Sequence, residues 1–120
     1  MNFKSSPIGH EISCVMKGIN KSILNNHKKI KEKIISKLKK EKFGILNISE
    51  YEFSPQGFTL IILLSESHLA IHTYPEHNSL YFNMYSCRSE NDSEKTYKFV
   101  LKLLKPKEIN EYNNSKVKII

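Results

Sequence analysis

The sequence has little of what membrane spans, signal peptides and disulfide frameworks require. None of its 120 positions lies in a run of about 18 or more apolar residues, so no membrane-spanning helix is expected. The first residues, Met1 to Pro7, lack the apolar block of a signal peptide. Only two cysteines are present, Cys14 and Cys87, and in a reducing compartment such a pair is more often free than bridged. We therefore expect a soluble, cytoplasmic protein without a membrane partner.

Motifs for metal ions and nucleotide phosphates are missing as well. The sequence contains no Cys-x-x-Cys, His-Glu-x-x-His or P-loop spacing, so neither kind of site is expected. It contains no internal repeat. A chain of this length fits one domain over residues 1–120, which can bury a core but leaves little room for a separate substrate domain. A site that needs many walls would then be shared between protomers.

The formal net charge of +7 is concentrated in one segment, because eight lysines fall between residues 28 and 42. Between them, residues of one helical face recur at steps of three and four. These are Ile23, His27, Ile30, Ile34 and Leu38. We expect one helix, capped by Asn20 and ended by Gly44. With no arginine or aromatic residue beside it, the basic face is more typical of a solvated helix than of a nucleic-acid site. No nucleic-acid partner is expected.

The rest of the chain has strand patterns and one more helix. The strands are expected at residues 8–16, 45–54, 58–65, 68–74 and 80–87. The apolar run 58–65 predicts a central strand covered on both faces. A second helix follows Asn91 and ends before Pro106, and a last strand lies beyond Lys107. The order predicts an α+β two-layer sandwich, an antiparallel sheet with two helices on one face.

One stretch carries more chemistry than a buried strand needs. Residues 64–76 read Leu-Ser-Glu-Ser-His-Leu-Ala-Ile-His-Thr-Tyr-Pro-Glu, with two imidazoles and two carboxylates among its alcohols. Taken by itself, Ser67 beside Glu66 and His68 is weak evidence for a hydrolase, because no Gly-x-Ser-x-Gly elbow surrounds it. The simpler alternative is a serine at the end of a strand.

The order Glu66-Ser67-His68, followed by Ile-His-Thr-Tyr-Pro-Glu at 71–76, resembles the self-cleaving site of the prokaryotic S-adenosylmethionine decarboxylases, which are small pyruvoyl enzymes. The resemblance runs from about Ile8 to Leu104. It implies that the Ser67 hydroxyl attacks the Glu66 carbonyl, and that the resulting ester eliminates to dehydroalanine, which hydrolyses to a pyruvoyl group and ammonia. The products would be a β chain, 1–66, and an α chain, 67–120, that begins with the pyruvoyl cofactor.

The same resemblance implies roles for five further residues. His72 assists cleavage by proton transfer, and Thr59 stands where the family has a serine that polarises the scissile carbonyl. Cys87 protonates the α-carbon after decarboxylation. Phe53 stacks on adenine, and Glu76 accepts hydrogen bonds from the ribose. Without the resemblance, each of these would be read as an ordinary core or surface residue.

Two histidines are further candidates. Strand alternation puts His68 on the same face as His72, so either imidazole could be reached from that face. His10, in the Gly-His opening of the first strand, is a candidate for the same pocket as Phe53 and Glu76.

The implied activity is decarboxylation of S-adenosylmethionine, which supplies the aminopropyl donor for spermidine biosynthesis, by a processed homodimer. A pyruvoyl ketone suits this reaction because it condenses with the substrate amine and accepts the electrons that carbon dioxide leaves behind. The chain has Asn83 and Tyr74 where the family often has Asp and Trp. These departures leave open an arginine or ornithine decarboxylase of the same fold, or an unprocessed regulatory homologue.

Overall fold

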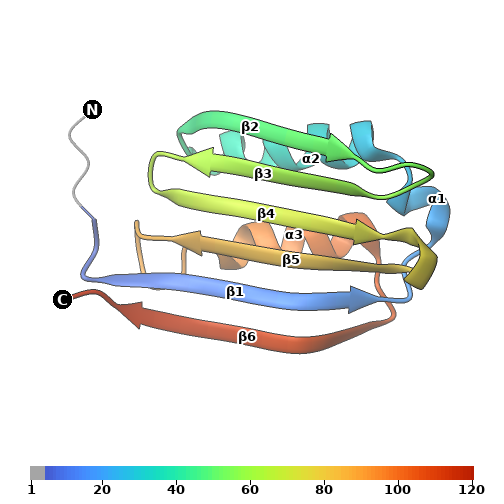
Figure 1. Ribbon diagram of the computed structural model, residues 1–120. Helices are drawn as coiled ribbons and strands as arrows, with labels where there is room; N and C mark the ends of the chain where they lie inside the picture. Colours follow the sequence, from blue (N-terminus) through green and yellow to red (C-terminus); the bar gives the residue numbers. More distant parts are fainter. Residues whose placement is uncertain (1–4) are drawn as a thin grey trace.

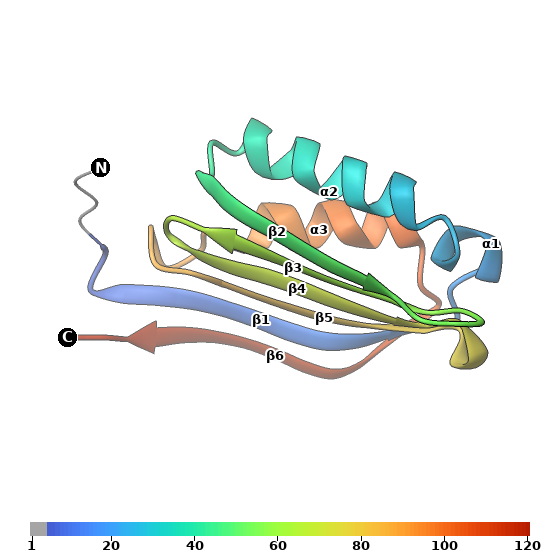
Figure 2. The ribbon, with the colours of Figure 1, turned by 45° about the horizontal axis from the view of Figure 1, so that its top comes forward.

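A six-stranded antiparallel sheet carries its two long helices on one of its faces, and the two short helical segments lie at one end of the sheet (Figures 1 and 2). The computed structural model describes residues 5–120. Its strands are β1 (Ile8–Lys17), β2 (Ile45–Glu52), β3 (Phe58–Leu64), β4 (Ser67–Tyr74), β5 (Ser79–Ser86) and β6 (Glu108–Lys118). Its helices are α1 (Lys21–Leu24), α2 (His27–Lys40), the short 3-10 turn η1 (Pro75–His77) and α3 (Glu94–Leu104). The strand order is β2-β3-β4-β5-β1-β6. The predicted α+β two-layer fold is confirmed.

The lysine-rich segment forms two helices where one was predicted. Asn20 caps α1 as expected, with its side chain accepting from the Ser22 N–H. Asn26 then caps α2 by accepting from the Lys29 N–H at 3.3 Å. Asparagine is a good N-cap because its short side chain competes for backbone N–H groups, and this ends the first helix after a single turn. The apolar stripe of α2 still packs into the core.

The sheet has one covered face and one open face. Along β3, Phe58, Leu60 and Ile62 are fully buried under α2 and α3, whereas Ile61 and Leu63 on the opposite face are 46% and 49% exposed. The prediction that this strand is covered on both faces is therefore wrong for the single chain. Its apolar side chains point to both faces of the sheet, but helices pack against only one of these faces (Figure 2).

The β3–β4 hairpin positions the residues singled out in the sequence. Its register pairs Leu63 with His68 near the connecting turn and Thr59 with His72 farther along. The Ser65–Glu66 connection lies at one end of the sheet, and η1 and the β2–β3 loop lie at the other (Figure 1). Within residues 5–120, no helix is long and apolar enough to cross a membrane.

Candidate active site

The peptide bond between Glu66 and Ser67 lies at the turn of this hairpin, and Gly44, the residue before β2, holds the two residues that precede the bond. The Ser65 N–H donates to the Gly44 carbonyl at 2.8 Å, and the Gly44 N–H donates to Glu66 Oε1 at 3.2 Å. A Cβ at Gly44 would lie 2.5 Å from Ser65 Oγ, so this close approach favours glycine. Glu66 is buried as a result, with 8% of its surface exposed.

The Glu66 carbonyl accepts two hydrogen bonds from Cys87. The Cys87 backbone N–H lies 3.2 Å from that oxygen, and the thiol Sγ lies 2.6 Å from it. Donors on a carbonyl oxygen stabilise the negative charge that develops there when a nucleophile adds to the carbon. Cys87 makes these bonds because it follows the last residue of β5, although the strand was predicted to include it. The arrangement suits attack on the carbonyl of residue 66.

The Ser67 hydroxyl is next to this carbonyl in the chain and has no competing contact. Its Oγ is buried and finds no hydrogen-bond partner in the described part of the chain. A buried polar group without a partner costs about 1–3 kcal/mol, and such groups concentrate at functional sites. The Ser67 oxygen is therefore free to act as a nucleophile.

His72 and Thr59 lie elsewhere. Thr59 Oγ1 is 3.0 Å from His72 Nδ1, and the two residues are cross-strand partners. Five residues of strand separate Ser67 from His72, which is about 16 Å at the usual rise. An odd separation also puts the two side chains on opposite faces of β4. One chain thus does not bring Thr59 and His72 to its own Glu66 carbonyl.

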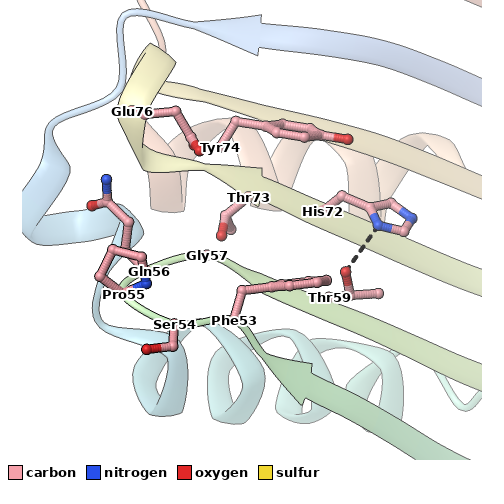
Figure 3. A pocket seen from close by; sticks show the side chains of 10 residues that line it. All are labelled: Phe53, Ser54, Pro55, Gln56, Gly57, Thr59, His72, Thr73, Tyr74 and Glu76. Atoms are coloured by element: carbon pink, nitrogen blue, oxygen red, sulfur yellow. Dashed lines mark hydrogen bonds between the residues drawn. The ribbon is translucent and has the colours of Figure 1, made fainter.

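A cavity of about 390 Å³ occupies the other end of the hairpin, on the face away from the helices (Figure 3). Phe53 and Glu76, both singled out in the sequence, line it together with Thr59 and His72. Tyr74 and the loop Ser54–Gly57 complete its walls. The sequence analysis predicted only the strands on either side of this loop, and no motif marked the loop as part of a site. The cavity offers aromatic faces and a carboxylate to a ligand.

The two remaining candidate histidines lie on opposite faces. His68 shares the open face with His72, as predicted, and its Nε2 is 2.8 Å from Asn83 Oδ1. His10 is 1% exposed on the helix side, so the expectation that it faces the pocket is wrong. Its Nδ1 accepts from the Ser93 N–H at 3.0 Å, and its Nε2 is 2.7 Å from Asn114 Oδ1. These bonds tie β1 to the start of α3 and to β6.

The surroundings of Cys87 favour the protonated thiol. Burial raises the pKa of the Cys87 thiol, and the nearby Glu66 and Asp92 carboxylates raise it further. Its Sγ therefore keeps its proton at neutral pH, as a hydrogen-bond donor or general acid requires. Two neighbours that sequence patterns did not mark, Arg88 and Asp92, lie in the loop that follows.

A family profile described as S-adenosylmethionine decarboxylase matches residues 10–116. The chain is 34% identical over 104 residues to the S-adenosylmethionine decarboxylase proenzyme 2 of Bacillus anthracis, covering 87% of this chain and 85% of the relative. It is 33% identical over 101 residues to the S-adenosylmethionine decarboxylase proenzyme of Brevibacillus brevis, covering 84% and 76%.

Among solved structures, the chain is similar to the adenosylmethionine decarboxylase of Aquifex aeolicus, with a TM-score of 0.84. The match covers 98% of this chain and 95% of the other at 24% sequence identity. At that identity the likeness shows a shared fold.

Proposed function

This chain belongs to the S-adenosylmethionine decarboxylase family, and from that premise we propose that it cuts itself between Glu66 and Ser67 and then decarboxylates S-adenosylmethionine. The predicted family and the predicted enzyme class, a carboxy-lyase, are confirmed by the profile match and the curated relatives. The relatives described above are named for S-adenosylmethionine, and neither is named for arginine or ornithine. The observation that carries the proposal is the Glu66 carbonyl held by two Cys87 donors beside an unbonded Ser67 hydroxyl.

The proposed cut proceeds through an ester intermediate. Ser67 Oγ adds to the Glu66 carbonyl carbon, and the oxyanion is held by the Cys87 N–H and thiol. The carbon–nitrogen bond then breaks and leaves an ester between residue 66 and the Ser67 oxygen. Removal of the Ser67 α-proton breaks the bond between Ser67 Cβ and Oγ and releases the β chain with the main-chain carboxylate of residue 66 at its end. The dehydroalanine left at position 67 is converted by water to a pyruvoyl group with release of ammonia. The products are a β chain of residues 1–66 and an α chain of residues 67–120.

The residues present fit a pyruvoyl group at position 67. The Ser67 hydroxyl, at the start of β4, has no hydrogen-bond partner among residues 5–120, and the Cys87 thiol contacts the carbonyl of the preceding Glu66. The pyruvoyl ketone condenses with an amine and accepts the electrons released with carbon dioxide. Cys87 holds the proton that is delivered to the substrate α-carbon, because burial keeps its thiol protonated. No lysine is needed to form a Schiff base with a cofactor.

The pocket residues supply recognition of the substrate. Phe53 is 53% exposed, which leaves a ring face free to stack on an adenine base. Glu76 can accept hydrogen bonds from ribose hydroxyls, and its charge attracts the sulfonium of the substrate. Aromatic faces also stabilise a cation, which matters in a chain of net charge +7.

We propose a homodimer that unites the two ends of the hairpin. Within one chain His72 is about 16 Å along the strand from Ser67, too far for proton transfer between them. The open face of the sheet, with Ile61 and Leu63 about half exposed, offers apolar surface to a second copy. A two-fold assembly gives each copy the same contact, so the Thr59–His72 pair and pocket of one copy serve the cleavage turn of the other.

The proposed location is the cytoplasm.

The first test is the mass of the purified chain under denaturing conditions. Self-cleavage predicts two fragments that meet at Glu66 and Ser67, the α chain being blocked to Edman degradation. A folded wild-type protein that stays a single chain would contradict the proposal.

The second test is co-expression of Ser67→Ala with His72→Ala, each carrying a different tag. Neither variant should cleave alone, since one lacks the nucleophile and the other the proton-transfer group. In mixed dimers, the intact His72 of the Ser67→Ala chain should restore cleavage of the His72→Ala chain. Mixed dimers isolated through both tags and found uncut would show that His72 does not act across the interface.

A further inference from the structure

Arg88 is the only arginine in a chain with 19 basic residues, and it lies next to Cys87. Its Nε donates to Asp92 Oδ2 at 2.6 Å, and its Nη2 donates to Asp92 Oδ1 at 2.8 Å. Asp92 also accepts from the hydroxyl of Ser86, the last residue of β5. This two-point pairing of guanidinium and carboxylate fixes both position and orientation, which a lysine ammonium cannot do.

The same guanidinium reaches the end of α2. Its Nη1 donates to the Glu41 and Lys42 carbonyls, each at 3.1 Å. Its centre lies 3.6 Å from the centroid of the Phe43 ring. Glu41 is the C-cap of α2 and Lys42 follows it, so both carbonyls lie just past the last helical residue. The stacked ring holds the guanidinium in place. Arg88 thereby ties the Cys87 loop to the segment that leads into Gly44.

Both tied segments contact Glu66, the residue before the scissile bond. Gly44 donates to the Glu66 carboxylate, and Cys87 donates twice to the Glu66 carbonyl. Gly44 lies just before β2 and Cys87 just after β5. The backbone bonds that hold them, from the Ser65 N–H to the Gly44 carbonyl and from the Cys87 N–H to the Glu66 carbonyl, therefore stand at the ends of the sheet's ladders. An Arg88 side chain that joins the two segments is therefore in a position to set their separation.

We propose that Arg88, paired with Asp92, is a positioning residue that holds the Cys87 N–H and thiol on the Glu66 carbonyl, and so sets the rate of self-cleavage. The inference rests on the proposed cleavage at Glu66–Ser67. Arg88 touches neither the scissile bond nor the pocket and acts through Cys87. A misplacement of about 1 Å in a reacting group can lower a rate by about a hundredfold.

The test follows cleavage of freshly translated chain over time on denaturing gels. Arg88→Ala should cleave about tenfold to a hundredfold more slowly than wild type. Lys37→Ala is the matched control, because Lys37 pairs with Glu41 at the same helix end without touching the Cys87 loop. It should cleave at the wild-type rate. Asp92→Asn should fall between, since it keeps one acceptor and loses the charge.

Guanidinium chloride at millimolar concentration separates positioning from loss of stability. Guanidinium can occupy the space left in Arg88→Ala and should restore part of its cleavage rate. A variant that is merely destabilised would not be restored, because guanidinium at this concentration does not change stability measurably. In the cleaved Arg88→Ala enzyme, kcat for S-adenosylmethionine should fall with KM unchanged, because the pocket lies at the other end of the hairpin.

Each outcome decides the proposal. Slow cleavage that guanidinium restores supports it. Arg88→Ala that cleaves as fast as Lys37→Ala, or whose slow cleavage guanidinium does not restore, overturns it while leaving the proposed function intact. Wild type that never cleaves overturns both. If Arg88→Ala does not fold, Arg88→Lys takes its place and is judged in the same way, since lysine cannot bind Asp92 and both carbonyls at once.

Discussion

The two ends of the β3–β4 hairpin are built for opposite purposes. At the turn, Glu66 is 8% exposed, and both its carbonyl and its carboxylate are hydrogen-bonded to the same chain. At the other end, Phe53 and Tyr74 are 53% and 45% exposed around a cavity of about 390 Å³. A reaction of the chain with itself needs one fixed geometry, so it can occur in a closed turn. A substrate needs uncovered surface. Under the proposed function, the closed end holds the peptide bond that is cut, and the open end binds the substrate.

The largest expected effect is at the closed end. Ser67→Ala should abolish cleavage and all decarboxylation, because alanine lacks the attacking oxygen. The variant should fold, since the lost hydroxyl has no partner among residues 5–120. Ser65→Ala is a close control, because its hydroxyl is also buried without a partner there, yet it should cleave normally. Intact mass and carbon dioxide release are the measurements, and turnover by Ser67→Ala would show that the pyruvoyl assignment is wrong.

The next effect separates the cut from the turnover. Cys87→Ala should lose about 10²–10⁴-fold in decarboxylation, the usual contribution of a general acid. It should still cleave, though more slowly, because the backbone N–H of residue 87 continues to donate to the Glu66 carbonyl. Cys14→Ala removes the other thiol and serves as the control. Carbon dioxide release from fully cleaved protein gives the answer, and near-wild-type turnover would remove Cys87 from the mechanism.

A smaller effect is expected at the open end. Glu76→Gln should raise KM for S-adenosylmethionine about tenfold and leave kcat nearly unchanged, because a charged hydrogen bond to the ribose is lost in both ground and transition states. Its cleavage rate should equal that of wild type. Glu90→Gln, outside the cavity, is the control. If Glu76→Gln fails to cleave, the two ends of the hairpin are not separable in the way proposed.

The smallest expected effect concerns the thiol of Cys14, which has no proposed role in cleavage or in substrate binding. Burial raises the pKa of the Cys14 thiol to about 11 from an ordinary value of 9.0. The folded chain therefore holds this proton more tightly than the unfolded chain, and the resulting stability is complete below the ordinary pKa and is lost as pH rises towards 11. The free energy of unfolding should fall by about 1 kcal/mol from this group between about pH 7 and about pH 10.

Cys14→Ala should remove that part of the alkaline dependence. Denaturant unfolding of wild type and variant at several pH values provides the measurement. Equal slopes against pH for the two proteins would show that Cys14 does not titrate in this range.

Local patterns in the sequence predicted most of the fold, because alternation and capping act over a few residues. They were wrong where a local choice had two solutions, as at Asn25-Asn26, where one long helix became two. The arrangement of the site was harder to predict from the sequence. The number of residues between Ser67 and His72 already gives their separation along a strand. Only the strand register shows that Thr59 is paired with His72. The contacts of Arg88 join segments 46 and 47 residues apart, which no local pattern reveals.

The order of the strands bears on what happens to the two pieces after a cut at residue 66. The amino-terminal piece would contain β1, β2 and β3, and the carboxy-terminal piece would contain β4, β5 and β6. Yet β1 lies between β5 and β6 and pairs with both, while β3 pairs with β4. The pieces are therefore interlocked, and neither can leave without opening three ladders of the sheet. Such a protein would migrate as one species on a native gel and as two on a denaturing one.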